Sequence, residues 1–174
     1  GMRDAISLLE LCAGAHKTID DRLVFETVGS GNRENAYKII KAIGAADYDT
    51  IYSIIGNISE SSGDISVFWQ EIIDSYRDIM VVRNTGSAKT YLDLTEGEYE
   101  RVREISKDFS MAKLIYHTTI LEDALDDMQR ASNAKRSIAE IALTRMCDPK
   151  LVVSAEALAL RVEELEKQIS MIRL

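Results

Sequence analysis

Residues 110–147 decide the fold of this chain, and they read SMAKLIYHTTILEDALDDMQR, then ASNAKR, then SIAEIALTRMC. The link is short and rich in residues that cap helices, so the stretch predicts two helices that fold back on each other. Their side chains recur at steps of three and four, which gives each helix one apolar face. The positions are Met111, Leu114, Thr118, Leu121, Leu125 and Met128 in the first helix, and Ile138, Ile141, Ala142 and Met146 in the second. Two helices alone cannot bury both faces, so other helices must pack on them.

The rest of the chain shows the same helical spacing, with breaks at glycine and serine clusters. Residues 2–13 predict a helix that begins almost at the first residue, and a short helix follows through about Val28. Gly29-Ser30-Gly31 is the best candidate for a domain boundary. Further helices are expected over 32–44 and 47–58, followed by a break at 61–63.

Side chains that cap helices mark several of the expected starts. Asp64 precedes a longer helix that carries Phe68, Trp69 and Tyr76. Thr18 with Asp21 and Thr95 with Glu98 are spaced like capping boxes, and Ser110 precedes the first helix of the central pair. No segment shows the alternation of a strand. The sequence therefore predicts an all-α helical bundle, with the three aromatic residues in its core.

The last helix has a different pattern. Asp148-Pro149 reads as a cap with proline in the first turn. Apolar residues then alternate steps of four and three, at Leu151, Ala155, Leu158, Val162, Leu165, Ile169 and Ile172. This is a heptad pattern over about three repeats, and it fits a coiled coil and a long docked helix equally well.

Composition and charge exclude several classes of protein. The formal charge is −8, whereas proteins that grip DNA through its phosphates are usually basic. No apolar run reaches the length of a membrane span, so we expect a cytoplasmic protein with no membrane partner. Cys12 and Cys147 lie within apolar helical patterns and read as buried, reduced thiols.

The residues that carry chemistry form no recognisable catalytic or metal-binding set. Glu122, Asp123, Asp126 and Asp127 lie between positions of an apolar stripe, so we interpret them as a solvated helix face. His16 and His117 have no cysteine or second histidine at zinc-binding spacing, and Gly29 and Gly31 lack the rest of a dinucleotide loop. We expect no catalytic residue, no metal site and no enzyme activity in this chain.

One short string carries a family resemblance. Residues 2–9, MRDAISLL, resemble the sensor 2 segment of bacterial clamp-loader ATPases, usually (G/S)-M-R-D-A-L-S-L-L-(D/E). The wider chain resembles the C-terminal part of the gamma/tau subunits of DNA polymerase III. Residues 19–29 are similar to the last lid helix of that family, often I-T-x-x-x-V-x-x-x-L-G, and VFWQEII at 67–73 is similar to a helix of its collar. The family's hairpin typically ends in Pro-Arg, and here Lys135 stands in place of the proline.

The resemblance implies three regions. Residues 1–29 would be the end of an AAA+ lid domain, 30–150 the collar domain that joins subunits into a ring, and 151–174 a helix without a clear counterpart. Arg3 would be the sensor 2 arginine, which reaches the ATP phosphates in the intact subunit. The resemblance places ATP and Mg in the ATPase core of that subunit, whose motifs this sequence does not include, so we expect no appreciable ATP binding here.

The resemblance also implies partners in DNA replication. They are the other clamp-loader subunits (further gamma/tau copies, delta and delta-prime), with the sliding clamp and primed DNA contacted only through the ATPase domains. Two alternatives remain open at this point. One is an unrelated all-α module that dimerises through the heptads of residues 151–172. The other is a metal or cofactor bundle that uses the acidic residues of 122–127.

Overall fold

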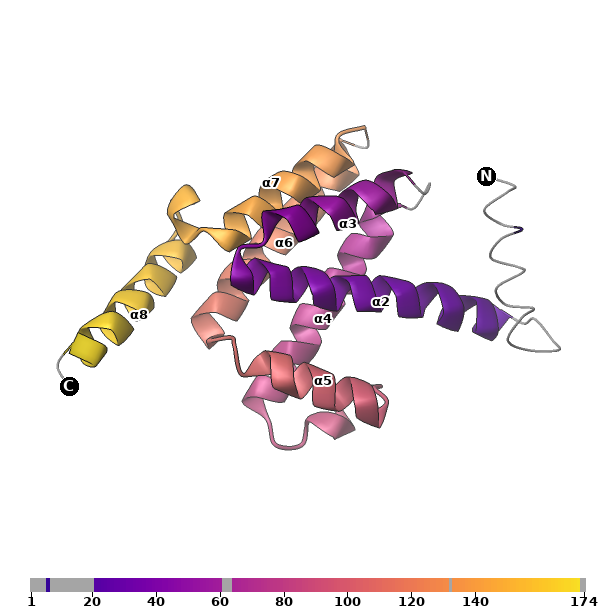
Figure 1. Cartoon of the computed structure of the whole chain (residues 1–174). Coiled ribbons are helices and arrows are strands. Elements are labelled where there is room, and N and C mark those ends of the chain that lie inside the picture. Colours follow the sequence, from indigo (N-terminus) through magenta and orange to yellow (C-terminus); the bar gives the residue numbers. More distant parts are fainter. Residues whose placement is uncertain (1–5, 7–20, 61–63, 132, 173–174) are drawn as a thin grey trace.

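Figure 1 shows the computed structural model, which describes residue 6 and residues 21–60, 64–131 and 133–172. These residues form α-helices and two short 3-10 helices, with no strand among them, so the all-α prediction is confirmed. The α-helices are α2 (Asp21–Ala45), α3 (Tyr48–Glu60), α4 (Ile65–Asn84), α5 (Glu96–Ser106), α6 (Met111–Arg130), α7 (Lys135–Cys147) and α8 (Ala155–Ile172). The 3-10 helices are η1 (Ala88–Thr90) and η2 (Pro149–Leu151).

Helix α4 forms the centre of the bundle. It packs against α2, α5, α6 and α7, while α3 lies beside α7 on one side and α8 lies against α6 at the edge (Figure 1). The predicted aromatic core is confirmed, because Phe68, Trp69 and Tyr76 on α4 are all fully buried. The indole Nε1–H of Trp69 donates to the backbone carbonyl of Leu121 in α6 at 2.9 Å, so its one polar group is satisfied.

Three predicted caps are present as expected. Thr95 and Glu98 form a complete capping box at the start of α5. The Ser110 hydroxyl accepts from the Lys113 N–H at the start of α6, and the Asp64 carboxylate accepts from the Ser66 N–H at the start of α4. These signals succeed because each depends only on residues two or three positions apart.

The predicted helix end at Gly29–Gly31 is wrong. Helix α2 runs through these residues to Ala45. Each glycine costs a helix interior about 1 kcal/mol, but the second half of α2 buries Tyr37, Ile39 and Ile40 in the core. This tertiary packing offsets the weak helix propensity of the glycines.

Replacing Gly31 with alanine should raise the free energy of unfolding by about 0.5–1 kcal/mol, measured by urea denaturation. Gly31 lies inside α2, and a Cβ atom built there meets no atom within 4 Å. Alanine therefore gains helix propensity without a clash. If Gly31→Ala left the protein unchanged or less stable, the continuity of α2 across this segment would be contradicted.

Helix α2 ends one residue later than the break expected at Gly44. The Asp47 N–H donates to the Ala42 carbonyl at 2.9 Å, and the Ala46 N–H donates to the Ile43 carbonyl at 3.2 Å. This is the pair of bonds of a Schellman motif, and it places Ala46 at a φ of 52°. Alanine thus occupies a left-handed position where glycine is normally favoured.

The last helix also begins later than predicted. Asp148 caps only the 3-10 turn η2, so Leu151 is not part of the heptad helix and is 58% exposed. Val152 then runs extended and packs partly against the core, and the Ser154 hydroxyl accepts from the Ala157 N–H at the start of α8. The burial of Val152 and the cap formed by Ser154 therefore move the start of the last helix past Pro149, where the sequence predicted it.

The prediction of buried positions in the central helix pair is wrong for one residue. Ala142 and Met146 are buried as predicted and Ile138 is partly buried, but Ile141 is 54% exposed. Ile138, Ala142 and Met146 are spaced by four and share one line of α7, and Ile141 lies off that line. The predictions for residues 2–13, Thr18 and 61–63 fall outside the described residues. No helix in the described part of the chain is both long and apolar enough to cross a membrane.

Candidate interaction surface

The sequence-predicted site residue Arg3 lies outside the described residues, as do Cys12 and His16. The role assigned to Arg3 therefore stays a prediction. The described residues hold the remaining candidates, which are the acidic cluster on α6, His117, Cys147 and the surface grooves.

The acidic residues on α6 form an exposed face. Glu122, Asp123, Asp126 and Asp127 are all exposed. Arg130 lies 3.8 Å from Asp126 and 4.0 Å from Asp127, as i,i+4 and i,i+3 pairs on the same helix. Within the residues that the structure describes, no three histidine, cysteine or acidic side chains lie close enough together to hold a metal ion.

His117 is buried in the bundle as a neutral imidazole. Its Nε2 lies 3.1 Å from the Met146 carbonyl, which can only accept, so Nε2 carries the proton. Its Nδ1 then accepts from the Tyr76 hydroxyl at 2.8 Å. Burial, together with the charge of Lys113, lowers the pKa of His117 to about 3. The ring holds α4, α6 and the end of α7 together.

Cys147 is a free thiol at the end of α7 and is half-buried. Burial raises its pKa to about 11, so the group is protonated at neutral pH. A protonated thiol is a poor nucleophile and a poor metal ligand.

An ionic cluster centred on Arg33 joins three helices. The Arg33 guanidinium on α2 lies 3.1 Å from Glu71, 3.5 Å from Asp78 and 3.1 Å from Glu98. Glu71 and Asp78 belong to α4, and Glu98 belongs to the capping box of α5. Burial raises the pKa values of Glu71 and Asp78, although the charge of Arg33 opposes that rise. The cluster is structural, because its groups face one another between packed helices.

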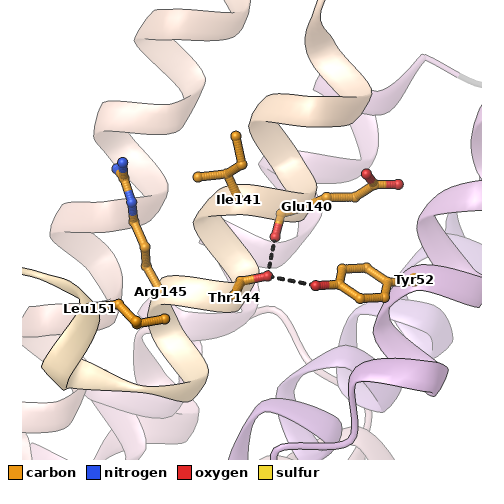
Figure 2. Close-up of a pocket in the computed structure, with 6 residues that line it drawn as sticks. All are labelled: Tyr52, Glu140, Ile141, Thr144, Arg145 and Leu151. Atoms are coloured by element: carbon orange, nitrogen blue, oxygen red, sulfur yellow. Dashed lines mark hydrogen bonds between the residues drawn. The ribbon is translucent and has the colours of Figure 1, made fainter.

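The surface carries an open groove formed by α3, α7 and η2, with a volume of about 560 Å³ (Figure 2). Three large apolar side chains that line it are exposed: Tyr52 at 40%, Ile141 at 54% and Leu151 at 58%. The other residues that line the groove are Glu140, Thr144 and Arg145. We call this feature the α3/α7 groove.

Hydrogen bonds fix the floor of the α3/α7 groove. The Tyr52 hydroxyl and the Thr144 hydroxyl lie 2.9 Å apart, and the Thr144 hydroxyl also donates to the Glu140 carbonyl at 2.7 Å (Figure 2). Thr144 therefore accepts from Tyr52, and the phenol ring is held across the two helices. A groove with fixed walls and exposed apolar side chains suits a partner's apolar side chain.

Sequence reasoning missed this groove. Its residues come from segments about 90 positions apart, and Ile141 was placed on the buried face of α7. The available signal was the spacing of three and four between Ala139, Ala142, Leu143 and Met146, which leaves Ile141 and Arg145 on the other side of α7.

By fold, the chain is an all-α helical-bundle domain with an exposed apolar groove. Residues 19–162 match the family described as DNA polymerase III subunits gamma and tau domain III. Because the match covers well over half of the chain, the chain belongs to this family. A search among curated proteins found no match. The family resemblance inferred from the sequence is thus confirmed, and the chain is not an unrelated module. Dimerisation through the heptads of residues 151–172 stays a prediction.

The family match reaches past both predicted domain boundaries, at residues 29 and 150, and α2 also crosses the first of them. The assignment of 1–29 to an AAA+ lid stays a prediction, and so does the separate status of 151–174.

Proposed function

We propose that this chain is the collar region of a gamma/tau-type clamp-loader subunit and that it holds neighbouring subunits together in the ring. The observation that carries the proposal is the family match over residues 19–162. The all-α bundle supports it, because packed helices with exposed apolar side chains are suited to side-by-side contact with other helices. In this role the chain is a scaffold and performs no chemistry of its own.

The partners in this proposal are the other clamp-loader subunits, namely further gamma/tau copies, delta and delta-prime. A chain with a net charge of −8 is poorly suited to binding DNA phosphates. In the proposal, primed DNA and the sliding clamp are therefore held by the ATPase domains of the assembled subunits. Because bacterial DNA replication takes place in the cytoplasm, the proposed role implies a cytoplasmic protein.

The proposal includes a role for Arg3 in the intact subunit. There its guanidinium would bind the ATP phosphates as a sensor 2 arginine, while Mg is held by the ATPase core. Residues 1–29 would form the end of the lid, 30–150 the collar, and 151–174 an additional C-terminal helix.

The α3/α7 groove is the part of the surface that we assign to a neighbouring subunit. Replacing Ile141 with arginine should weaken binding to a mixture of the delta and delta-prime collar domains by about tenfold or more. The exposed isoleucine would be buried against the neighbouring subunit, and a charged arginine in its place would have to lose its hydration on binding. Titration by isothermal calorimetry measures the change.

Tyr91→Arg provides the matched control. Tyr91 is 63% exposed, directly follows η1, and is not among the residues that line the groove. This variant should bind as the unmodified chain does. Equal binding by Ile141→Arg and Tyr91→Arg would contradict the assignment of the groove, and failure of the unmodified chain to bind would contradict the collar role.

A further inference from the structure

The outer face of α8 is apolar and has no partner in the described part of the chain. Leu158, Val162, Leu165 and Ile169 are spaced by four, three and four, and they are 51%, 53%, 55% and 51% exposed. We call these four residues the α8 stripe. Apolar residues that are exposed by chance on a helix do not recur at heptad spacing. The α8 stripe therefore indicates contact with a second helix.

The opposite face of α8 attaches it to the bundle. Ala157 and Leu160 are buried, and Glu163 accepts from the Ser110 hydroxyl at 2.7 Å. Helix α8 packs mainly on α6 and η2 and lies at the edge of the molecule (Figure 1). The contact with the bundle therefore leaves the α8 stripe accessible to another chain.

The side chains of the α8 stripe favour one kind of pairing. In heptad notation Val162 and Ile169 occupy a positions, and Leu158 and Leu165 occupy d positions. Branched Val and Ile at a combined with Leu at d favours a parallel coiled coil of two strands. The corrected start of α8 preserves this register, because Leu158 is the first large side chain of the stripe and lies within the helix.

The charges beside the α8 stripe are complementary to those of a second copy. Arg161 occupies a g position and Glu166 the following e position, and both are exposed. In a parallel pair a g residue faces the e residue five positions later on the other chain, so Arg161 of each copy faces Glu166 of its partner. Neither residue makes an ion pair with another side chain in the described ranges, so both charges are available for such a contact.

We propose that α8 forms a parallel two-stranded coiled coil with α8 of a second copy of this chain, through the α8 stripe and two Arg161–Glu166 pairs. The contact uses about two and a half heptads, which is short for a coiled coil, so the dimer is weak and depends on concentration. It does not rest on the proposed collar function, since the α3/α7 groove lies on other helices.

Two charge reversals test the proposal. In Arg161→Glu each pair becomes two glutamates, and in Glu166→Arg each pair becomes two arginines. We expect each variant alone to dimerise about tenfold more weakly than the unmodified chain, measured by sedimentation equilibrium. An equimolar mixture of the two variants places glutamate opposite arginine in both pairs, so it should recover dimers to within about twofold of the unmodified chain.

The control variant is Glu164→Arg, which changes charge at a c position away from the seam and should dimerise as the unmodified chain does. Circular dichroism checks that every variant keeps its helix content. The proposal is overturned by an unmodified chain that stays monomeric at millimolar concentration, by single variants that dimerise normally, or by a mixture that fails to recover dimers. The same variants should bind the delta and delta-prime collar domains normally, so failure here is separable from failure of the collar role.

Discussion

Replacing Arg33 with alanine is expected to lower the free energy of unfolding by about 2–4 kcal/mol at pH 7.5. The change removes the cation that Glu71, Asp78 and Glu98 share, and it leaves three carboxylates between α2, α4 and α5. Asp78 then keeps only its contact with Arg77, at 3.4 Å. Asp78 has a side chain only 8% exposed, so water cannot replace the lost partner there. Urea denaturation followed by circular dichroism measures the loss.

The penalty for Arg33→Ala should become smaller as the pH falls. Burial already raises the pKa values of Glu71 and Asp78 in the folded protein, and without Arg33 they rise further. A carboxyl group whose pKa is higher in the folded state than in the unfolded state favours folding more strongly as it becomes protonated. The difference from the unmodified protein should therefore be smaller at pH 4.5 than at pH 7.5.

Arg103→Ala is the matched control for this experiment. Arg103 is 58% exposed and pairs with Glu100 on its own helix at 3.2 Å. Exposed pairs of this kind contribute less than about 0.5 kcal/mol. If both substitutions had the same small effect, the Arg33 cluster would not be a structural element.

Lowering the pH from 7 to 5 should reduce the free energy of unfolding by about 2 kcal/mol, because of His117. The pKa of this histidine is about 3 in the folded protein and 6.5 in the unfolded chain. The neutral imidazole is thus favoured by folding, so its contribution is complete above pH 6.5 and is lost progressively as the pH falls toward 3. Each pH unit within that range is worth about 1.4 kcal/mol. Between pH 7 and pH 5 ordinary carboxylates change little.

Urea denaturation at pH 7, 6 and 5 measures how the free energy of unfolding depends on pH. Two histidine variants show which histidine causes that dependence. His117→Gln should be less stable at pH 7, since it loses the bonds to Tyr76 and Met146, and its stability should be nearly constant down to pH 5. His16 is the other histidine of the chain, and His16→Gln should retain the full dependence on pH. A flat profile for the unmodified protein would show that His117 is hydrated or charged in solution.

Local signals in the sequence predicted most of the helical framework. The capping box of Thr95 and Glu98 and the caps Ser110 and Asp64 each act within one turn, so the residues that decide the structure are adjacent in the sequence. The buried aromatic face of α4 was equally visible, because its spacing leaves few other arrangements for such large side chains.

The errors arose where distant contacts overrule local preference. Helix α2 continues through Gly29–Gly31 because its second half is buried, and Pro149 begins only a 3-10 turn because Val152 packs on the core. The Arg33 cluster joins residues up to 65 positions apart, and no periodicity reveals such a set. The α3/α7 groove is likewise created by the pairing of two helices, so only the folded structure brings Tyr52 and Ile141 together.

We propose that this chain joins clamp-loader subunits as a collar domain, and the mass of the assembled complex tests that role. Light scattering measures it most directly, on the chain alone and on mixtures with the delta and delta-prime collar domains. We predict that the mixture forms a species whose molar mass contains all three components, at concentrations where each component alone stays smaller. Masses in the mixture that equal those of the separate chains would contradict the collar role.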